Sequence, residues 1–235
     1  LTEASLLYAL GTVKYEMGDP KAARDLLQEA LLRQRRMSGA TSMDSALSMS
    51  ALAAAYFDLG MYGESETLQR RSLSAMEALR GDSHYALCAG LLSLANALRK
   101  QGKNEEAESV LLRSLAIRRS TLGDRHPFVA SDHTRLGDFY RAIGKWSDSE
   151  QHFRAAIAIR DSADSVGPSN QATSLTGLAM LMQQTQRYDE AEDLYGQALI
   201  LNRQALGENH PSVAQNLNNL ATVHKEQGDL VTAEA

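Results

Sequence analysis

Acidic residues recur at one position of the chain, at intervals of 42 residues, as Glu66, Glu108, Glu150, Glu192 and Glu234. Repeated carboxylates could serve acid and base catalysis or hold a metal ion. Acidic residues are also expected in the first turn of a helix, because the helix dipole favours negative charge there. The spacing puts each carboxylate in a different unit of the chain, too far from the next for a shared site. We therefore interpret the series as helix starts and not as a catalytic or metal-binding group.

Histidines recur in the same way, in segments with the composition of connectors. His84, His126 and His210 share one column, meaning positions separated by multiples of 42 residues. Each follows a Gly that ends a helix, and two of them precede a Pro that opens the next. Connector structure explains this recurrence without a metal. Neither His-x-x-x-His nor Cys-x-x-Cys occurs, so we predict no metal site and no cofactor.

Two single residues depart from the chemistry of their columns. Cys88 stands where other units have alanine, which predicts a small buried side chain and not a reactive thiol. His133 stands in a column that is otherwise apolar, so we expect a half-buried imidazole with its hydrogen bonds satisfied. The chain has no nucleophile with a paired base and no Gly-rich phosphate loop. We predict that it is not an enzyme.

The elements that position these residues follow an internal repeat. One column holds only leucine, and the next holds only Gly or Ala, which predicts that two helix backbones approach closely there. The leucines are Leu10, Leu52, Leu94, Leu136, Leu178 and Leu220, and the small residues are Gly11, Ala53, Ala95, Gly137, Ala179 and Ala221. The chain is therefore an array of one helical unit used about six times.

Each unit has the pattern of two amphipathic helices separated by a short break. The break carries a glycine at positions 18, 60, 102, 144 and 228, as a left-handed helix cap requires. Gln186 replaces that glycine in the fifth unit, which predicts a strained or differently closed turn. The connector Asp164-Ser165-Val166-Gly167-Pro168-Ser169 departs from the others in the place of its Gly, and we predict flexibility there.

Composition narrows the function classes. The net charge is −5, which disfavours nucleic-acid binding, since that usage needs a basic surface. No stretch approaches the roughly 20 apolar residues of a membrane-spanning helix, so we predict no membrane partner. At 43% hydrophobic residues, the chain can bury an ample core.

The helix pair with Leu-Gly or Leu-Ala in its first helix, a Gly turn and an Ala-rich second helix resembles the tetratricopeptide repeat (TPR). That repeat usually has 34 residues, and the 42-residue form resembles the array of kinesin light chains. The stretches 217–221, 188–192 and 122–127 carry this resemblance. It implies an all-α fold, a right-handed α-solenoid of about five and a half units in one domain, residues 1–235. The expected units are residues 1–40, 41–82, 83–124, 125–166, 167–208 and a truncated 209–235.

The resemblance also implies a concave groove, lined by the first helices, that holds an extended peptide. Transferred to this chain, the groove positions include Tyr8, Tyr15, Phe57, Asn96, Arg99, Arg135, Asp138, Arg141, Asn218, Asn219 and Lys225. The first units present aromatic rings, and the later ones present Arg, Lys and Asn. Such a groove suits an acidic segment with an apolar or aromatic end. Alternatively, the aromatic rings pack between adjacent helices and the arginines are solvated surface charges.

We therefore predict a cytoplasmic protein-interaction scaffold that binds a partner's acidic peptide. The alternative is a regulatory or oligomerisation arm of a larger signalling enzyme whose catalytic domain lies outside these residues. We also predict self-association through exposed terminal helices, because solenoids need polar caps.

Overall fold

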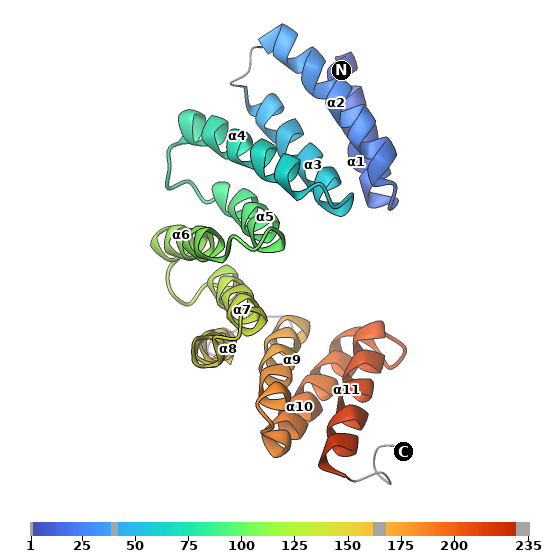
Figure 1. Ribbon diagram of the computed structural model, residues 1–235, viewed down its shortest axis with the longest axis vertical. Helices are drawn as coiled ribbons and strands as arrows, with labels where there is room; N and C mark the ends of the chain where they lie inside the picture. The colour runs from blue at the N-terminus through green and yellow to red at the C-terminus, as the bar shows by residue number, and fades with distance from the viewer. Residues whose placement is uncertain (1, 39–41, 162–167, 229–235) are drawn as a thin grey trace. The chain divides into compact units, whose positions relative to one another are not determined.

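The computed structural model describes residues 2–38, 42–161 and 168–228, and these residues form eleven α-helices without a strand (Figure 1). The all-α repeat array expected from the sequence is thereby confirmed. Contacts divide the chain into two compact units, Leu1–Ile117 and Arg118–Ala235, with the division inside helix α6. The expected flexible connector at 164–167 and the carboxylate of Glu234 lie outside the described residues.

Consecutive helices pack together in pairs, and we call each pair a repeat. Repeats 1, 2, 4 and 5 are α1 with α2, α3 with α4, α7 with α8 and α9 with α10. Repeat 3 is α5 with α6, which meet where Cys88 contacts the carbonyl of Ser114, and α11 opens repeat 6. In the first unit the bounds are α1 (Glu3–Glu16), α2 (Pro20–Ser38), α3 (Met43–Asp58), α4 (Tyr62–Arg80), α5 (Leu87–Lys100) and α6 (Asn104–Leu122). In the second unit they are α7 (Pro127–Ala142), α8 (Trp146–Asp161), α9 (Pro168–Gln184), α10 (Tyr188–Leu206) and α11 (Pro211–Gln227).

The column of small residues marks the contact between the two helices of a repeat. A Cβ on Gly11 would lie 2.7 Å from Leu27, and one on Gly137 would lie 2.8 Å from the ring of Phe153. Neither distance is tolerated by real side chains, so these glycines allow the second helix to approach. The close backbone approach predicted from the sequence is confirmed within both units.

The turn inside each repeat is left-handed, as predicted. The glycines at 18, 60, 102, 144 and 228 all have positive φ. Gln186 has a φ of 62° and is the one described residue other than glycine in this region. Its backbone N–H still donates to the carbonyl of Gln183 at 3.0 Å, so the turn closes at the cost of a strained φ.

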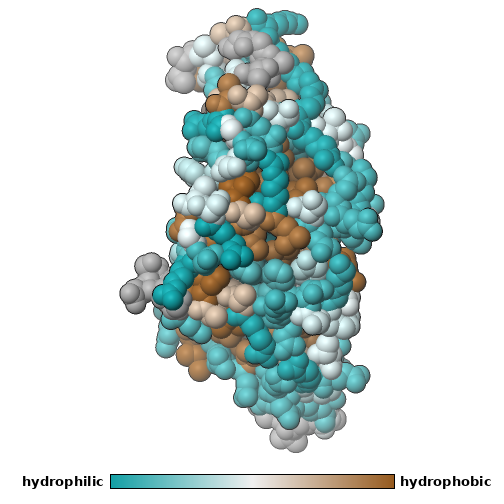
Figure 2. Space-filling model, turned by 90° about the vertical axis from the view of Figure 1, so that its left-hand side faces the viewer, coloured by the Kyte–Doolittle hydropathy of each residue, from teal (hydrophilic) through white to brown (hydrophobic). Residues whose placement is uncertain are grey.

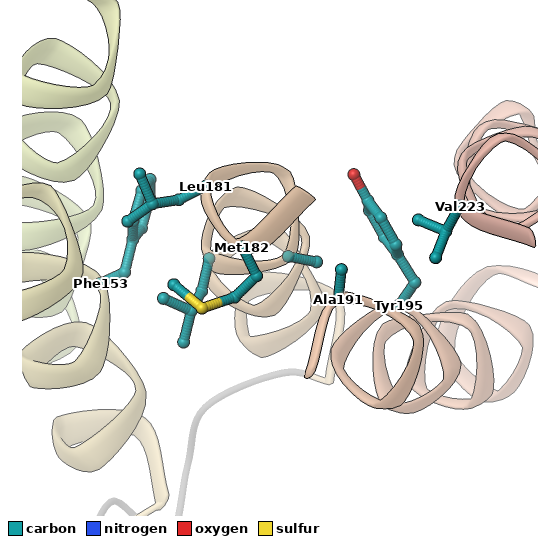
Figure 3. Packing of buried hydrophobic residues seen from close by; sticks show 8 residues of the cluster. Phe153, Leu181, Met182, Ala191, Tyr195 and Val223 are labelled. Carbon is teal, nitrogen blue, oxygen red and sulfur yellow. The ribbon is translucent and has the colours of Figure 1, made fainter. Parts of the chain in front are cut away.

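The core of the second unit shows how the repeats are filled. Phe153 of α8 is fully buried and faces Leu181 and Met182 of α9 (Figure 3). Tyr195 of α10 lies between Ala191 and Val223, and so links α10 to α11 (Figure 3). Burying such large apolar side chains is the main source of stability in an array of this kind.

The leucine column is buried in repeats 2 to 5 but not in repeat 1. Leu52 is 3% exposed and Leu178 is 1% exposed, whereas Leu10 is 55% exposed. Leu10 belongs to the first described helix, and no other described helix covers this face of it. Together with Leu6, Val13 and Met17, Leu10 forms an apolar stripe on α1.

The carboxylates at the starts of second helices have a structural role that the sequence reading did not assign. Glu66 accepts hydrogen bonds from Arg70 at 2.9 Å and from Lys103 at 2.7 Å, and Arg70 reaches Glu106 at 2.5 Å. These four residues form what we call the Glu66 cluster, and it joins repeat 2 to repeat 3. Burial alone would raise the pKa of Glu66, but the hydrogen bonds from Lys103, Arg70 and Gln101 lower it to about 2.

The second unit contains an equivalent group, 84 residues later, which we call the Glu150 cluster. Glu150 accepts from Arg154 at 2.7 Å and from Arg187 at 2.8 Å, while Arg187 also binds Glu190 with two hydrogen bonds. Burial again acts against the charged form, yet the two arginines lower the pKa of Glu150. The cluster joins repeat 4 to repeat 5.

The connector histidines accept hydrogen bonds at helix starts: His126 and His210 are the N-caps of α7 and α11, and His84 accepts just before α5 begins. The Nδ1 atom of His126 accepts a hydrogen bond from the N–H of Phe128 at 3.1 Å, and His84 and His210 accept in the same way from Ala86 and Ser212. The predicted structural role of this column is confirmed. No described helix is long and apolar enough to span a membrane. One face of the molecule is mostly hydrophilic, with apolar patches between the charged side chains (Figure 2).

Candidate binding surface

The first helices of neighbouring repeats contact one another directly within each unit. In the first unit α1 contacts α3 and α3 contacts α5, and in the second unit α7 contacts α9. Side chains connect α9 to α11, since Thr176 donates to Asn216 at 3.3 Å and Gln183 donates to Glu226 at 3.1 Å. Each unit therefore presents a continuous surface of first helices, which we call the first-helix surface.

In the first unit the aromatic side chains on this surface are partly used in packing. Tyr15 bonds through its hydroxyl to Asp58, and burial together with this bond raises the pKa of Tyr15 to about 12. The ring of Phe57 contacts that of Tyr62, with centroids 5.3 Å apart. Tyr8 is half-buried. For Tyr15 and Phe57, the alternative that aromatic rings link adjacent helices describes the contacts found.

The polar positions of α5 belong to the same unit. Asn96 is exposed and Arg99 is half-buried. Both lie within α5, Arg99 in its last turn, so the helix fixes their backbone positions. Their role in binding remains a prediction.

A pocket of about 460 Å³ opens on the first-helix surface of the second unit. Asp138 of α7, Thr176 and Met180 of α9, and Gln215 and Asn216 of α11 line it. Helices from three consecutive repeats thus form one concavity. Its walls are mostly neutral amides and hydroxyls, with one carboxylate.

Asn216 gives this pocket its most specific chemistry. The residue is 2% exposed, its Oδ1 accepts the hydrogen bond from Thr176, and its Nδ2 has no partner among the described residues. A buried amide donor without a partner is costly, and a ligand carbonyl would satisfy it. Sequence reasoning did not single out Asn216. The sequence did hold a signal for it. Asn216 shares its column with Ser48 and Ser174, which are polar residues and are also buried.

The predicted cations of the second unit differ in their surroundings. Arg135 and Lys225 are exposed. Arg141 is only 17% exposed at its side chain and contacts Asp138 at 3.3 Å. Its Nε is buried and has no hydrogen-bond partner among the described residues.

The two asparagines taken from the family motif lie beside the pocket-lining residues of α11. Asn218 is exposed, and Asn219 is half-buried and accepts a hydrogen bond from Gln215 at 2.9 Å. Gln215 lines the pocket, so Asn219 orients a pocket residue. Asn218 lies on the same helix, and its backbone carbonyl accepts a hydrogen bond from Thr222 at 2.8 Å.

His133 is half-buried, as expected, and its partner is a second histidine. The Nδ1 atoms of His133 and His152 are 2.9 Å apart. Burial lowers the pKa of His133 to about 4; His152 and Arg119 act in the same direction, and Asp124 opposes them. Cys88 is buried too, as predicted, with its Sγ 3.7 Å from the carbonyl oxygen of Ser114.

Comparison with family models places the whole fold. The tetratricopeptide-repeat model matches residues 2–78, 86–162 and 170–235. The chain belongs to the tetratricopeptide-repeat family. Arrays of this family generally mediate protein–protein interaction and are typically not catalytic. A comparison with curated proteins gave no match.

Solved TPR structures are similar in fold. The nearly identical TPR-like repeats assigned to a kinesin light chain of Podosopora anserina share 21% identity and a TM-score of 0.74, covering 86% of this chain and 96% of that one. BtubC (BKLC) from P. vanneervenii shares 20% identity and a TM-score of 0.73, covering 100% and 88%. A signal transduction ATPase with a TPR sensor from Pyrococcus horikoshii shares 17% identity and a TM-score of 0.70, covering 96% of this chain and 39% of that one. The kinesin-light-chain-like TPR fold expected from the sequence is confirmed.

Proposed function

We propose that this TPR chain is a scaffold that binds an extended segment of a partner protein on its first-helix surface. The observation that carries the proposal is the pocket of about 460 Å³ with the unpartnered Nδ2 of Asn216. An extended peptide offers a backbone carbonyl at every residue, and such a carbonyl satisfies an amide donor. The family relationship supports the same general activity.

We further propose that the bound segment is acidic, with an apolar or aromatic residue. The exposed side chains of Arg135 and Lys225, with the partly exposed Arg141 in the same unit, support this charge preference. Arg141 can bind a carboxylate through two parallel hydrogen bonds if its weak contact to Asp138 gives way. In this arrangement the neutral pocket binds the backbone of the peptide, and the three cations bind its acidic side chains.

The test uses fluorescence anisotropy with two labelled peptides of equal length, one alternating Glu and Ser and one alternating Lys and Ser, each with a central Trp. The Glu peptide should bind the chain more tightly, and Arg135→Glu combined with Arg141→Glu should weaken it at least about tenfold. Asn216→Leu should weaken both peptides alike, because it removes a backbone contact. Arg125→Glu, an exposed charge in a connector, is the matched control and should change nothing. Equal binding of both peptides to all variants would contradict the acidic preference.

A second candidate function is a regulatory or oligomerising arm of a larger signalling enzyme. The exposed stripe of Leu6, Leu10, Val13 and Met17 favours it, because the equivalent positions of repeat 2 are occupied by residues that are buried or half-buried. Its spacing of four, three and four residues is that of a helix–helix seam, and two copies of α1 can pack along it with two-fold symmetry. We propose a second copy of this chain as its occupant.

Light scattering over a range of concentrations tests this self-association. The chain should form dimers, and Leu10→Glu with Val13→Glu should leave a monomer. Leu32→Glu, at an exposed apolar residue on α2, is the control and should remain dimeric. A wild-type chain that is monomeric at every concentration would rule out the second copy.

A further inference from the structure

A second cavity, of about 640 Å³, lies between repeats 1 and 2, apart from the pocket on the second unit. Helices α2, α3 and α4 form it. Its floor is apolar, with Leu52 and Tyr56 of α3 and Leu68 of α4, and its rim carries Gln28 and Glu64. Such a cavity is built to accept an apolar stem that ends in a polar group.

Two other junctions have a charged pair at the corresponding positions, whereas Leu112 and Gly196 stand in the place of the arginine at the remaining two. Arg70 lies 42 residues after Gln28, and Glu106 lies 42 residues after Glu64. In the Glu66 cluster Arg70 donates to Glu106 at 2.5 Å. The same pair recurs in the second unit as Arg154 and Glu190, with 3.8 Å between the charged atoms. At each of these junctions an arginine of the second helix meets a carboxylate of the next repeat.

The junction of repeats 1 and 2 keeps the carboxylate but lacks the arginine. Gln28 is shorter and neutral, and its Nε2 donates to the hydroxyl of Tyr56 at 2.5 Å instead of reaching Glu64. Glu64 is exposed, and no ion pair to it is found in the described residues. Gly63 contributes no side chain to the rim, where the second and fourth junctions have Glu105 and Asp189.

We propose that this cavity binds an arginine side chain of a partner protein. The stem of the arginine would lie on Leu52 and Leu68, and its guanidinium would bind the carboxylate of Glu64. The partner would thus supply the group that the chain supplies for itself as Arg70 and Arg154. Arginine fits better than lysine, because its planar group can pair with a carboxylate in two contacts and stack on the ring of Tyr56. This site is independent of the first-helix surface.

Nuclear magnetic resonance with a small probe tests the proposal on the intact chain. N-acetyl-arginine amide should cause saturable shifts at the backbone amides of Gly63 and Thr67. N-acetyl-norleucine amide, which has an uncharged aliphatic side chain, should bind at least about tenfold more weakly. Equal binding of the two probes, or no saturable shift with the arginine probe, would overturn the proposal.

Two variants test the charges at this cavity: one removes the carboxylate, and the other adds an arginine. Glu64→Gln removes the carboxylate and should weaken the arginine probe at least about tenfold. Gln28→Arg supplies the missing arginine within the chain and should block the cavity. The matched control is Glu106→Gln, which alters the equivalent carboxylate of the Glu66 cluster and should leave the shifts at Gly63 and Thr67 unchanged. Since Glu64 is an exposed residue, Glu64→Gln decides the matter even if Gln28→Arg does not fold; unchanged binding to it would overturn the proposal.

Discussion

Two junctions of the first unit use the same helix positions but different chemistry. Between repeats 2 and 3, Glu66 and Arg70 join the two repeats through ion pairs. Between repeats 1 and 2 the corresponding residues are Arg24 and Gln28, and Arg24 pairs instead with Asp25 of its own helix at 2.7 Å. Ion pairs connect repeats 2 and 3, whereas a cavity lies between repeats 1 and 2.

The difference shows which features a repeat needs in order to stack. Both junctions keep the small and leucine columns, and Leu52 and Leu94 are each 3% exposed. Apolar packing therefore forms the array, while the charged positions are free to vary. A junction without ion pairs has surface left for other contacts.

Removing the packing itself should have the largest effect. Phe153 is fully buried and contacts both Gly137 and Gly177, so Phe153→Ala should lower the free energy of unfolding by about 3–5 kcal/mol. Urea unfolding followed by circular dichroism measures this loss. Phe128→Ala is the control, since Phe128 is 55% exposed and should cost far less. Equal losses would mean that the buried column does not dominate stability.

Breaking the Glu66 cluster should cost less than breaking the packing. Glu66→Gln keeps the shape of the side chain but removes the charge that Arg70 and Lys103 share, and we expect a loss of about 1 kcal/mol at neutral pH. Arg24→Gln at the other junction should cost less than about 0.5 kcal/mol, because its one ion pair is exposed. Urea midpoints of the two variants compare the junctions directly.

The pKa of Glu66 gives this loss a defined pH range. Its value in the folded chain, about 2, lies below the ordinary value of 4.5, so the native state favours the carboxylate. The stabilisation is complete above pH 4.5 and is lost as the pH falls towards 2. The difference between wild type and Glu66→Gln should shrink over that range. A constant difference down to pH 2 would show that the charge contributes nothing.

His133 contacts His152 within one repeat, whereas the Glu66 cluster connects two repeats. Its pKa of about 4 lies below the ordinary 6.5, so the neutral imidazole is favoured in the folded chain. The resulting stability is present above pH 6.5 and is lost as the pH falls through 4. His133→Leu, which restores the leucine of Leu91 and Leu175, should remove this loss and gain about 1 kcal/mol at pH 4. A flat wild-type profile would contradict the prediction.

Much of the fold could be predicted from the sequence because each column repeats one physical requirement. Gly11 and Gly137 report a close helix approach, and the positive φ of Gln186 was expected from the glycines it replaces. Leu10 could not be interpreted in the same way. Its column predicts burial, but burial depends on a covering helix, and no described helix covers Leu10.

The candidate site was predictable only in part. The position of a residue in the repeat determines where its backbone lies, but it does not determine which side chains it contacts. Arg141 and Asp138 were both expected on the first-helix surface, but their mutual contact was not. Asn216 was missed, since its importance comes from a buried amide nitrogen without a partner. Likewise the carboxylate of Glu66 was interpreted as a helix start, and its two cations became evident only when the repeats were packed.

Completing the junction of repeats 1 and 2 should have the smallest effect on stability. Gln28→Arg places an arginine opposite Glu64, as in the Glu66 cluster, and should raise the free energy of unfolding by about 0.3–0.5 kcal/mol. The gain is small because Glu64 is exposed and the hydrogen bond from Gln28 to Tyr56 is lost. Gln28→Arg combined with Glu64→Gln should lose the gain, which separates the new ion pair from the added side chain. A gain that persists in the double variant would show that filling the cavity, and not charge, distinguishes the two junctions.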